Sequence, residues 1–294
     1  MVTNMFERLI WQKDRILLDD LVFYLDRDTS DLTNGFLLDK PTRLLSQYMT
    51  MWQQRSEMRV KNVLELGIYG GGSIAFWFEL LQPDKYVALD LEPWGDTDYF
   101  NKYISSHKLE NRIKTFWKTD QSNREALRAI VATEFNGPPD LIIDDASHFY
   151  SETKASFETL FPKLRPGGLY IIEDWSWGCW PNLPPVNSRL PIGTELPKLI
   201  HQIVDAAGSM GRFLSSEPSN IKLRTINPLI ASVTTYADIV VIERGGAEMT
   251  GEVEFNLDDY ITFRPYSNFL ARCISRTRFA AAKLAKTTFG YSTR

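Results

Sequence analysis

The sequence predicts an α/β fold, built on a mostly parallel sheet with helices on both faces. From residue 60 to about residue 175, strand-like and helix-like stretches alternate with short connections, which is typical of a parallel sheet. A glycine-rich turn follows the first of these strands. Ligands bind to such sheets beyond the carboxyl ends of the strands, so residues at those ends are the first candidates for a functional site.

The alternating region is expected to contain strands separated by single helices. The strands are expected at residues 60–66, 86–90, 113–117, 140–144 and 168–173, and the helices at residues 72–82, 97–107, 123–134 and 151–163. Each crossover between parallel strands should be right-handed.

The stretch that organises this region is Val60–Ser73, which reads VKNVLELGIYGGGS. Its apolar residues predict a buried strand, and its glycines allow the backbone to approach a ligand closely before a helix begins. A nicotinamide-binding turn would need glycine at positions 67, 69 and 72, and residue 69 is a tyrosine. The turn instead reads E-x-G-x-x-x-G, with Glu65, Gly67 and Gly71. It is either a cofactor cradle or only a tight β–α connection.

The composition is that of a globular protein with a sizeable core, since 44% of the 294 residues are hydrophobic and 24% are charged. The net charge of −4 argues against nucleic acid as a partner. Cys179 and Cys273 have no metal-binding or redox spacing, and the first residues lack a secretory pattern. No apolar run is long enough to span a membrane. A cytoplasmic location is therefore expected.

Residues 1–58 are predicted to form a helical cap before the first strand of the sheet. Apolar residues recur at helical spacing in Phe6–Trp11 and in Ile16–Leu25. Such an extension could close over a substrate or form a subunit contact, or its side chains could only pack on the sheet. The candidates for a contact with the site are Arg43, Tyr48 and Trp52.

Acidic residues follow two further strands at positions suited to a cofactor. Asp90 lies 23 residues after Gly67, close to the distance at which an acid of the second strand meets a ribose diol. Asp120 follows the third strand, where its carboxylate could accept a hydrogen bond from an adenine amino group. As an alternative, Asp120 caps the next helix, because Asp is a common N-cap residue.

The fourth and fifth strands deliver two pairs of acids and a histidine. The segment LIIDDASH places Asp144, Asp145 and His148 after one strand, and LYIIED places Glu173 and Asp174 after the next. Carboxylates on adjacent parallel strands would repel one another, and a cation relieves that repulsion. Oxygen ligands without nearby cysteine favour Mg²⁺, with Mn²⁺ or Ca²⁺ as alternatives. One of these acids is expected instead to face solvent or to cap a helix.

Together, the segments ELGIYGGGS, ALD, IIDDASH and LRPGGLYIIEDW resemble the class I S-adenosylmethionine-dependent methyltransferases. Within that class, the chain is most similar to metal-dependent O-methyltransferases that act on sugars of macrolides and related natural products. The resemblance covers roughly residues 60–245, including a hairpin over 230–236 and 239–243 that is similar to the family's last two strands. It implies a Rossmann-like sheet of seven strands, in which the last hairpin brings an antiparallel strand.

The resemblance also implies roles for individual residues. The S-adenosylmethionine-binding residues would be Glu65, Gly67, Tyr69, Gly71, Ser73, Asp90, Asp120 and Gln121. Among them, Glu65, Gly67 and Gly71 would hold the methionine part, Asp90 the ribose, and Asp120 and Gln121 the adenine. The metal ligands would be Asp144, Glu173 and Asp174, and the catalytic residues His148 and Asp145. Which of the two adjacent aspartates, Asp144 or Asp145, binds the metal stays open.

Methyl transfer from this cofactor needs a nucleophile that is aligned with the activated methyl group and loses its proton. A divalent cation eases the loss of that proton from an aliphatic hydroxyl, and a nearby histidine can accept it. His148 stands at the right strand end for this role. Its alternative role is structural, at the start of the helix over residues 151–163.

Two segments beyond the fifth strand have a distinctive composition. Residues 175–181 contain three tryptophans, which predicts an aromatic loop that covers the site or packs in the core. The tail has five acids in residues 246–259 and seven Lys or Arg in residues 260–294. A basic amphipathic helix over Asn268–Thr287 could contact an anionic membrane or an acidic partner, or dock on another subunit.

The sequence therefore predicts an O-methyltransferase that depends on S-adenosylmethionine and Mg²⁺ or Mn²⁺ and acts on a sugar or glycosylated natural product. It would combine a cap over residues 1–58, a methyltransferase domain over 59–245 and a tail over 246–294, and would form a homo-oligomer. A metal-independent methyltransferase is the nearest alternative. A nicotinamide-dependent oxidoreductase and a non-catalytic cofactor-binding scaffold are further alternatives.

Overall fold

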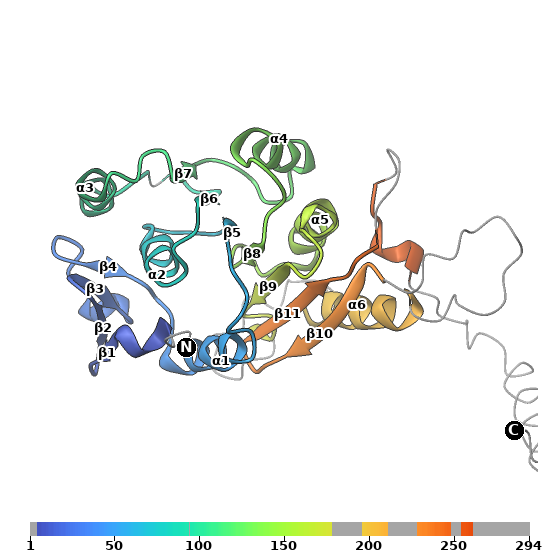
Figure 1. The fold of residues 1–294 in the computed structure, drawn as a ribbon, viewed down its shortest axis with the longest axis horizontal. Helices are drawn as coiled ribbons and strands as arrows, with labels where there is room; N and C mark the ends of the chain where they lie inside the picture. Colours follow the sequence, from blue (N-terminus) through green and yellow to red (C-terminus); the bar gives the residue numbers. More distant parts are fainter. Residues whose placement is uncertain (1–4, 94, 178–195, 211–227, 248–253, 261–294) are drawn as a thin grey trace, which may run out of the picture. The chain divides into compact units, whose positions relative to one another are not determined.

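The computed structural model describes residues 5–93, 95–177, 196–210, 228–247 and 254–260. The chain divides into two units, Met1–Tyr260 and Ile261–Arg294, and the described residues all belong to the first. Within this unit, a large sheet lies between two layers of helices, and a small sheet is formed by the N-terminal residues (Figure 1).

The large sheet has seven strands in the order β10-β11-β9-β8-β5-β6-β7, which confirms the predicted Rossmann-like sheet. The strands are β5 (Asn62–Leu66), β6 (Lys85–Leu89), β7 (Ile113–Phe116), β8 (Leu141–Asp144), β9 (Leu169–Glu173), β10 (Ile230–Thr235) and β11 (Ile239–Arg244). β11 is antiparallel to β9 and β10, as expected, and the other neighbours pair in parallel. The strand order reverses between β5 and β8, so a ligand is expected in the crevice beyond these two strands.

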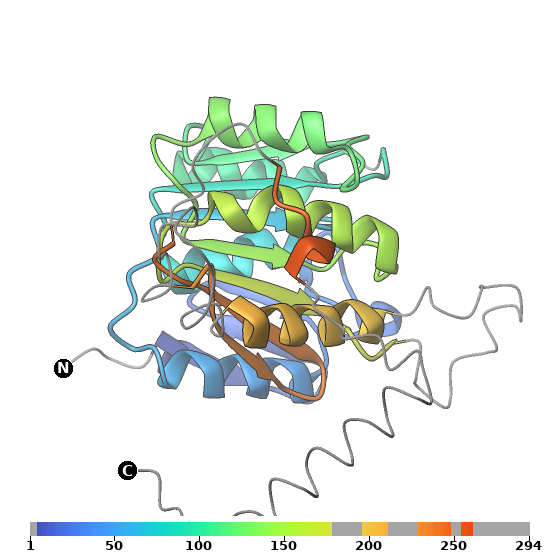
Figure 2. The ribbon, with the colours of Figure 1, turned by 90° about the vertical axis from the view of Figure 1, so that its right-hand side faces the viewer.

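Helices cover both faces of the large sheet. One face carries α4 (Arg124–Glu134), α5 (Tyr150–Leu160) and α6 (Leu196–Met210), which lie side by side in Figure 2. The other face carries α2 (Gly72–Leu81) and α3 (Asp98–His107), and α1 (Thr42–Gln53) lies on that side near β10 and β11 (Figure 1). The expected helices of the alternating region are confirmed, and α6 has no counterpart among them.

The central strands are buried because helices cover the sheet on both sides. Every residue of β8 and β9 is buried, which explains why these strands read as continuous apolar runs in the sequence. None of the described helices combines the length and the apolar composition that a membrane span requires.

The expectation of helices in the first 25 residues is wrong, because this segment forms strands. The small sheet has the order β1-β2-β3-β4, with β1 (Leu9–Trp11), β2 (Arg15–Leu18), β3 (Leu21–Tyr24) and β4 (Phe36–Leu37). Short 3-10 helices cover Met5–Arg8 and Arg27–Thr29. The only α-helix described in residues 5–58 is α1.

The physical reason for this error lies in the turn at Asp19. Ile16 and Leu18 are buried at every second position before the turn, and Leu21 and Phe23 are buried at every second position after it. The two-residue turn, with Asp19 at a φ of 55°, shifts the second alternation by one residue. Two short alternations with that offset resemble a helical pattern.

The small sheet packs against α2 and brings its last strand to the start of that helix. The Phe23 ring stacks on Phe36 with a centroid distance of 5.4 Å and meets Phe76 of α2 edge-on at 5.3 Å. A Cβ atom at Gly72 would lie 1.9 Å from the carbonyl oxygen of Leu37. The glycine at the first position of α2 therefore lets residues 37–40 lie directly beside the glycine-rich turn.

α1 is fixed to the far edge of the large sheet. Arg43 and Gln47 each bond the buried Asp238 carboxylate, between β10 and β11, at 2.5 Å. Trp52 is buried in the core, so of the three candidates for a contact with the site, only Tyr48 reaches a predicted site residue.

Part of the predicted tail packs on the large unit. Phe255 is buried with its ring 6.2 Å from that of Phe157 on α5, and the Leu257 amide donates to Glu158. The first unit thus extends to Tyr260, and the predicted division into a cap, a methyltransferase domain and a tail stays a prediction. The predicted basic helix over residues 268–287 lies outside the described residues.

Candidate functional site

A cavity of about 730 Å³ opens at the carboxyl ends of β5, β6 and β8. Its wall includes the turn after β5, the segments after β6, β7 and β8, and residues 37–40 of the N-terminal segment. The predicted site residues that line it are Gly67, Tyr69, Ser73, Asp90, Asp120, Gln121, Asp145, His148 and Asp174. Glu65, Gly71, Asp144 and Glu173 do not line it. This location agrees with the reversal of strand order between β5 and β8.

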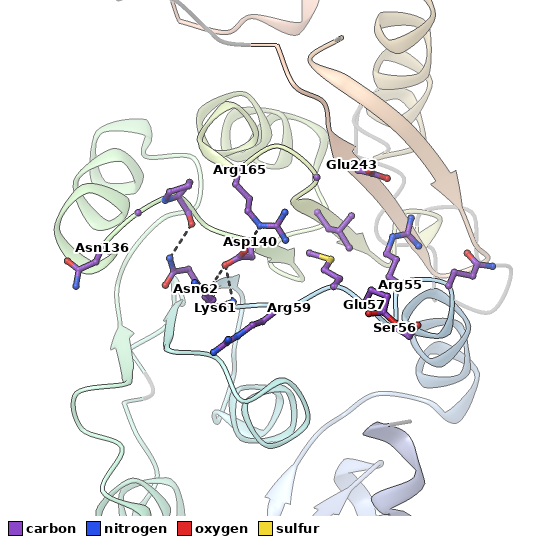
Figure 3. Close-up of a pocket in the computed structure, with 16 residues that line it drawn as sticks. Arg55, Ser56, Glu57, Arg59, Lys61, Asn62, Asn136, Asp140, Arg165 and Glu243 are labelled. Carbon is purple, nitrogen blue, oxygen red and sulfur yellow. Dashed lines mark hydrogen bonds and ion pairs between the residues drawn. The ribbon is translucent and has the colours of Figure 1, made fainter. Parts of the chain in front are cut away.

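A second cavity, of about 800 Å³, lies at the opposite edge of the sheet (Figure 3). There, Asp140 accepts hydrogen bonds from the backbone amides of Lys61 and Asn62, and it forms an ion pair with Arg165. Asp140 thus joins the amino-terminal ends of neighbouring strands. None of the predicted site residues lines this cavity.

The glycine-rich turn is held tightly between β5 and β8. Gly67 has a φ of +81°, and a Cβ atom there would lie 2.2 Å from the carbonyl oxygen of Asp145. Gly71 has a φ of +83° and precedes the first residue of α2. These two positions need glycine because of their backbone conformation and, at Gly67, because of close packing.

The Asp90 carboxylate closes the turn from β6. Its Oδ2 accepts hydrogen bonds from the amides of Ile68 and Tyr69 at 2.9 Å each, and its Oδ1 accepts from Glu92 at 2.8 Å. Tyr69 lies at the cavity rim with 41% of its surface exposed, and the Arg27 guanidinium lies 4.8 Å from the centre of its ring. Asp90 therefore shapes the turn and also lines the cavity.

Glu65 is fully buried beside the turn. The Tyr86 hydroxyl donates to its Oε2 at 2.7 Å, while Oε1 makes no hydrogen bond with the described residues. Burial raises the pKa of Glu65 from 4.5 to about 7. A buried acceptor without a donor is costly unless a ligand supplies one.

Glutamine at position 65 is expected to flatten the pH dependence of stability. Because the folded pKa is raised from 4.5 to about 7, the stabilising contribution of Glu65 is complete below pH 4.5 and is lost as the pH rises through 7. Relative to the wild type, the free energy of unfolding of Glu65→Gln should increase by about 2 to 3 kcal/mol from pH 5 to pH 8. Urea unfolding at both pH values, without cofactor, measures this difference. Parallel pH profiles for the two proteins would contradict it.

Asp120 and Gln121 both line the cavity, but their side chains have different hydrogen-bond partners. Asp120 accepts a hydrogen bond from the amide of Ser122, whereas the side chain of Asn123 caps α4. The alternative role of Asp120 as the cap of this helix is therefore not what the structure shows. Gln121 is buried, donates to Asp144 at 3.1 Å and accepts from the Ser147 amide at 2.8 Å.

Asp144, one of the predicted metal ligands, does not line the cavity. Its buried carboxylate accepts hydrogen bonds from Ser156 and Tyr170 at 2.6 Å each, in addition to the bond from Gln121. Burial raises the pKa of Asp144. Successive side chains of a strand point to opposite faces, so Asp144 faces α5 while the next residue, Asp145, reaches the cavity.

The side chains of Asp145, His148 and Asp174 converge at the cavity. One ligand atom from each lies within 4.8 Å of the others, and these three form the group with metal-binding geometry among the described residues. His148 Nε2 lies 3.8 Å from Asp145 Oδ1. His148 and Asp174 have φ values of 56° and 48°, an uncommon conformation that is often found at functional sites.

Glu173 lies behind this group and is bound by the N-terminal segment. The buried Lys40 ammonium lies 2.6 Å from Glu173 Oε2 and 2.8 Å from Asp145 Oδ2, and the Tyr48 hydroxyl donates to Glu173 Oε1 at 2.7 Å. Lys40 is the main site residue that the sequence analysis missed. It precedes Asp145 by 105 residues, and no local pattern marks it as a partner of these acids.

The electrostatics of the group follow from burial and charge. Burial, together with repulsion by Asp145, raises the pKa of Glu173 to about 8 and also raises the pKa of Asp174. Burial alone would lower the pKa of Lys40, but the Asp145 and Glu173 carboxylates outweigh it and raise that pKa. Among the described residues, Lys40 is the lysine that pairs with this group of carboxylates, which leaves an excess of negative charge that favours a bound cation.

Two tryptophans of the predicted aromatic loop are described. The Trp177 ring lies 6.4 Å from both the His148 and the Phe149 ring centres, whereas Trp175 donates its indole N–H to the Tyr236 carbonyl at 2.9 Å. Trp177 is thus the described aromatic residue of this loop that lies beside the site. Trp180 lies outside the described residues.

Comparisons with known proteins agree with this geometry. The family described as "Methyltransferase domain" matches residues 64–175. Mycinamicin VI 2''-O-methyltransferase of Micromonospora griseorubida is 31% identical over 191 residues, which are 62% of this chain and 43% of that protein. Demethylmacrocin O-methyltransferase of Streptomyces fradiae is 34% identical over 165 residues, 52% of this chain and 38% of that protein. The chain thus spans less than half the length of these two relatives.

A solved structure shows the same fold. The MycE methyltransferase from the mycinamycin biosynthetic pathway, in complex with Mg and SAH, has a TM-score of 0.50 and 24% sequence identity, covering 82% of this chain and 57% of that one. The resemblance to class I S-adenosylmethionine-dependent methyltransferases predicted from the sequence is confirmed by these relatives and by the domain match.

Proposed function

We propose that this chain, which resembles the class I S-adenosylmethionine-dependent methyltransferases, transfers a methyl group from that cofactor to a hydroxyl of a sugar or glycosylated natural product. The observation that carries the proposal is the convergence of Asp145, His148 and Asp174 within 4.8 Å of one another, on the wall of the cavity that the glycine-rich turn borders. A cofactor turn and an acid–histidine group thus border one cavity.

The residues present fit S-adenosylmethionine. The cavity volume of about 730 Å³ lies in the range of ligand pockets. Glu65 Oε1, a buried acceptor without a hydrogen bond from the described residues, lies beside the turn that we propose holds the methionine part. In this proposal, the turn from Gly67 to Gly71 holds the methionine part, Asp90 holds the ribose, and Asp120 and Gln121 lie beside the adenine.

The residues also fit a hard divalent cation such as Mg²⁺. Asp145 and Asp174 offer carboxylate oxygens, the neighbouring His148 ring stays available as a base, and the described part of the group contains no cysteine. Asp145 replaces Asp144 in the ligand set that we propose. Glu173 stands behind the group and is bound by Lys40 and Tyr48.

The proposed chemistry needs the acceptor hydroxyl to lose its proton as the methyl group arrives. When bound, S-adenosylmethionine supplies an activated methyl group, and a divalent cation makes an aliphatic hydroxyl easier to deprotonate. His148 accepts the proton, and Asp145, 3.8 Å away, stabilises the protonated imidazole that results. Trp177 and Phe149 offer aromatic surface beside His148 for the C–H face of a sugar ring.

The names of the relatives support a glycoside as acceptor, because one further relative, 32% identical over 42% of this chain, is an 8-demethyl-8-alpha-L-rhamnosyl tetracenomycin-C 2'-O-methyltransferase. Oligomerisation, a cytoplasmic location and contact through the basic tail stay predictions.

A calorimetric titration with S-adenosylmethionine, with and without Mg²⁺, followed by a methyl-transfer screen of glycosides, tests the proposed function. Binding of the cofactor and methylation that stops in EDTA and resumes with Mg²⁺ are expected. Activity that survives EDTA would favour the metal-independent alternative, which the balancing charge of Lys40 makes physically reasonable. Binding of NAD(P) instead of S-adenosylmethionine would favour an oxidoreductase, and cofactor binding without turnover would favour a scaffold.

A further inference from the structure

Lys40 is a buried lysine that bridges two acids of the site. Only 2% of its surface is exposed, and its Nζ lies 2.8 Å from Asp145 Oδ2 and 2.6 Å from Glu173 Oε2. It comes from the N-terminal segment, two residues before α1, whereas the acids follow or end β8 and β9. A charged lysine is rarely this buried unless it is paired.

Both oxygens of the Glu173 carboxylate accept a hydrogen bond from the N-terminal segment. Oε2 accepts from Lys40 and Oε1 accepts from Tyr48 on α1 at 2.7 Å. Among the described residues, Asp145 Oδ2 accepts a hydrogen bond from Lys40, while Oδ1 lies 3.8 Å from His148 Nε2. Glu173 is accordingly absent from the metal-binding group that Asp145, His148 and Asp174 form among the described residues.

We propose that Lys40 is a built-in counter-cation, a positioning residue that keeps Glu173 out of the metal ligand set and orients Asp145 toward His148. This inference rests on the proposed function, which identifies the site. It concerns how the positive charge of Lys40 offsets the negative charges of Asp145 and Glu173. With Lys40 in place, one positive charge already neutralises part of the acidic group. A divalent cation then binds to Asp145 and Asp174 with moderate affinity.

Removing the ammonium group of Lys40 while keeping its hydrocarbon chain should make the acidic group bind a divalent cation more strongly. Lys40→Met keeps the buried hydrocarbon chain and leaves Glu173 and one oxygen of Asp145 without a cation. The buried Glu173 and the half-buried Asp145, once without their cation, destabilise the protein and at the same time attract a divalent ion more strongly. The variant should therefore lose thermal stability in EDTA and regain it with metal.

The test compares the wild type and Lys40→Met by calorimetric titration with Mg²⁺ and Mn²⁺ alone, and by thermal unfolding with EDTA or Mg²⁺. We expect the variant to bind the metal at least about tenfold more tightly, which corresponds to about 1.4 kcal/mol of extra attraction. In EDTA, its unfolding midpoint should fall by about 5 °C or more, and saturating Mg²⁺ should restore most of that loss.

Lys154→Met is a matched control, because Lys154 also bridges two acids, Glu158 at 3.4 Å and Asp258 at 2.7 Å, away from the metal-binding group. Any change in its unfolding midpoint should be the same in EDTA and in Mg²⁺, and its metal affinity should equal that of the wild type.

The double variant Lys40→Met/Glu173→Gln keeps the test decisive if the single variant does not fold. The loss of one positive charge is matched there by the loss of one carboxylate, so the protein should fold and bind metal within about threefold of the wild type. If Lys40 only fills space, the double variant should be no more stable than Lys40→Met.

The outcomes separate this inference from the proposed function. Unchanged metal affinity in Lys40→Met, or a stability loss that Mg²⁺ does not restore, would overturn the role of Lys40 while leaving a metal-dependent wild type intact. Metal binding by the variant but not by the wild type would support the role of Lys40 and remove the metal from the proposed function. Absence of metal binding in both proteins would overturn both.

Discussion

Replacing His148 by glutamine is expected to lower kcat for methyl transfer by about 10² to 10⁴-fold, the usual contribution of a positioned general base. His148 is placed for this role on the cavity wall, with Nε2 3.8 Å from Asp145 Oδ1 and its ring 6.4 Å from that of Trp177. Glutamine keeps the polarity of the side chain but cannot take up a proton. Affinity for S-adenosylmethionine should change little, because the residues proposed to hold the cofactor are untouched.

A methyl-transfer assay with saturating cofactor measures this loss, and calorimetry measures the cofactor affinity. His201→Gln is the matched control, since His201 is exposed on α6 and does not line the cavity. Its kcat should equal that of the wild type. If His148→Gln kept wild-type turnover, the histidine would have the structural role that the sequence left open.

Alanine at position 67 is expected to destabilise the protein by about 2 to 4 kcal/mol and to abolish cofactor binding. The added Cβ would lie 2.2 Å from the carbonyl oxygen of Asp145, and the backbone φ of +81° is unfavourable for any residue with a Cβ. The clash pushes the glycine-rich turn away from the end of β8. It therefore displaces both the proposed cofactor turn and the acid beside His148.

Gly95→Ala separates the two causes of this effect. Gly95 has a similar φ of +73°, but a Cβ there would meet no atom of the described residues within 4 Å. Its substitution should cost only about 1 kcal/mol, from backbone strain alone. Urea unfolding and calorimetry with S-adenosylmethionine on both variants give the comparison. Equal losses at the two positions would show that close packing against Asp145 does not matter.

The alternating region was predictable because its signals are local. The strands Leu141–Asp144 and Leu169–Glu173 are continuous apolar runs, which buried parallel strands require. The glycines at positions 67 and 71 mark a turn that other residues would strain. Residues that end or follow the strands then reach one edge of the sheet by topology alone, which is why Asp145, His148 and Asp174 could be proposed together.

The first 58 residues were less predictable, since their elements are short. The strands around Asp19 contain only four residues each, and one turn with a two-residue loop offsets their alternations. Over such lengths, a period of 2 and a helical period cannot be told apart. Burial distinguishes the two patterns. Phe23 is buried against Phe76 of α2, a residue that is distant in the sequence.

By itself, the sequence determined the α/β class, the strand and helix order, the glycine-rich turn and the edge of the sheet where the acids gather. Only the tertiary structure decided what each acid does. Asp144 and Asp145 are adjacent and chemically identical, yet Ser156 and Tyr170 bind the first while the second lines the cavity. Likewise, nothing local pairs Lys40 with Glu173, because a contact across 133 residues depends on how the N-terminal segment packs against the sheet.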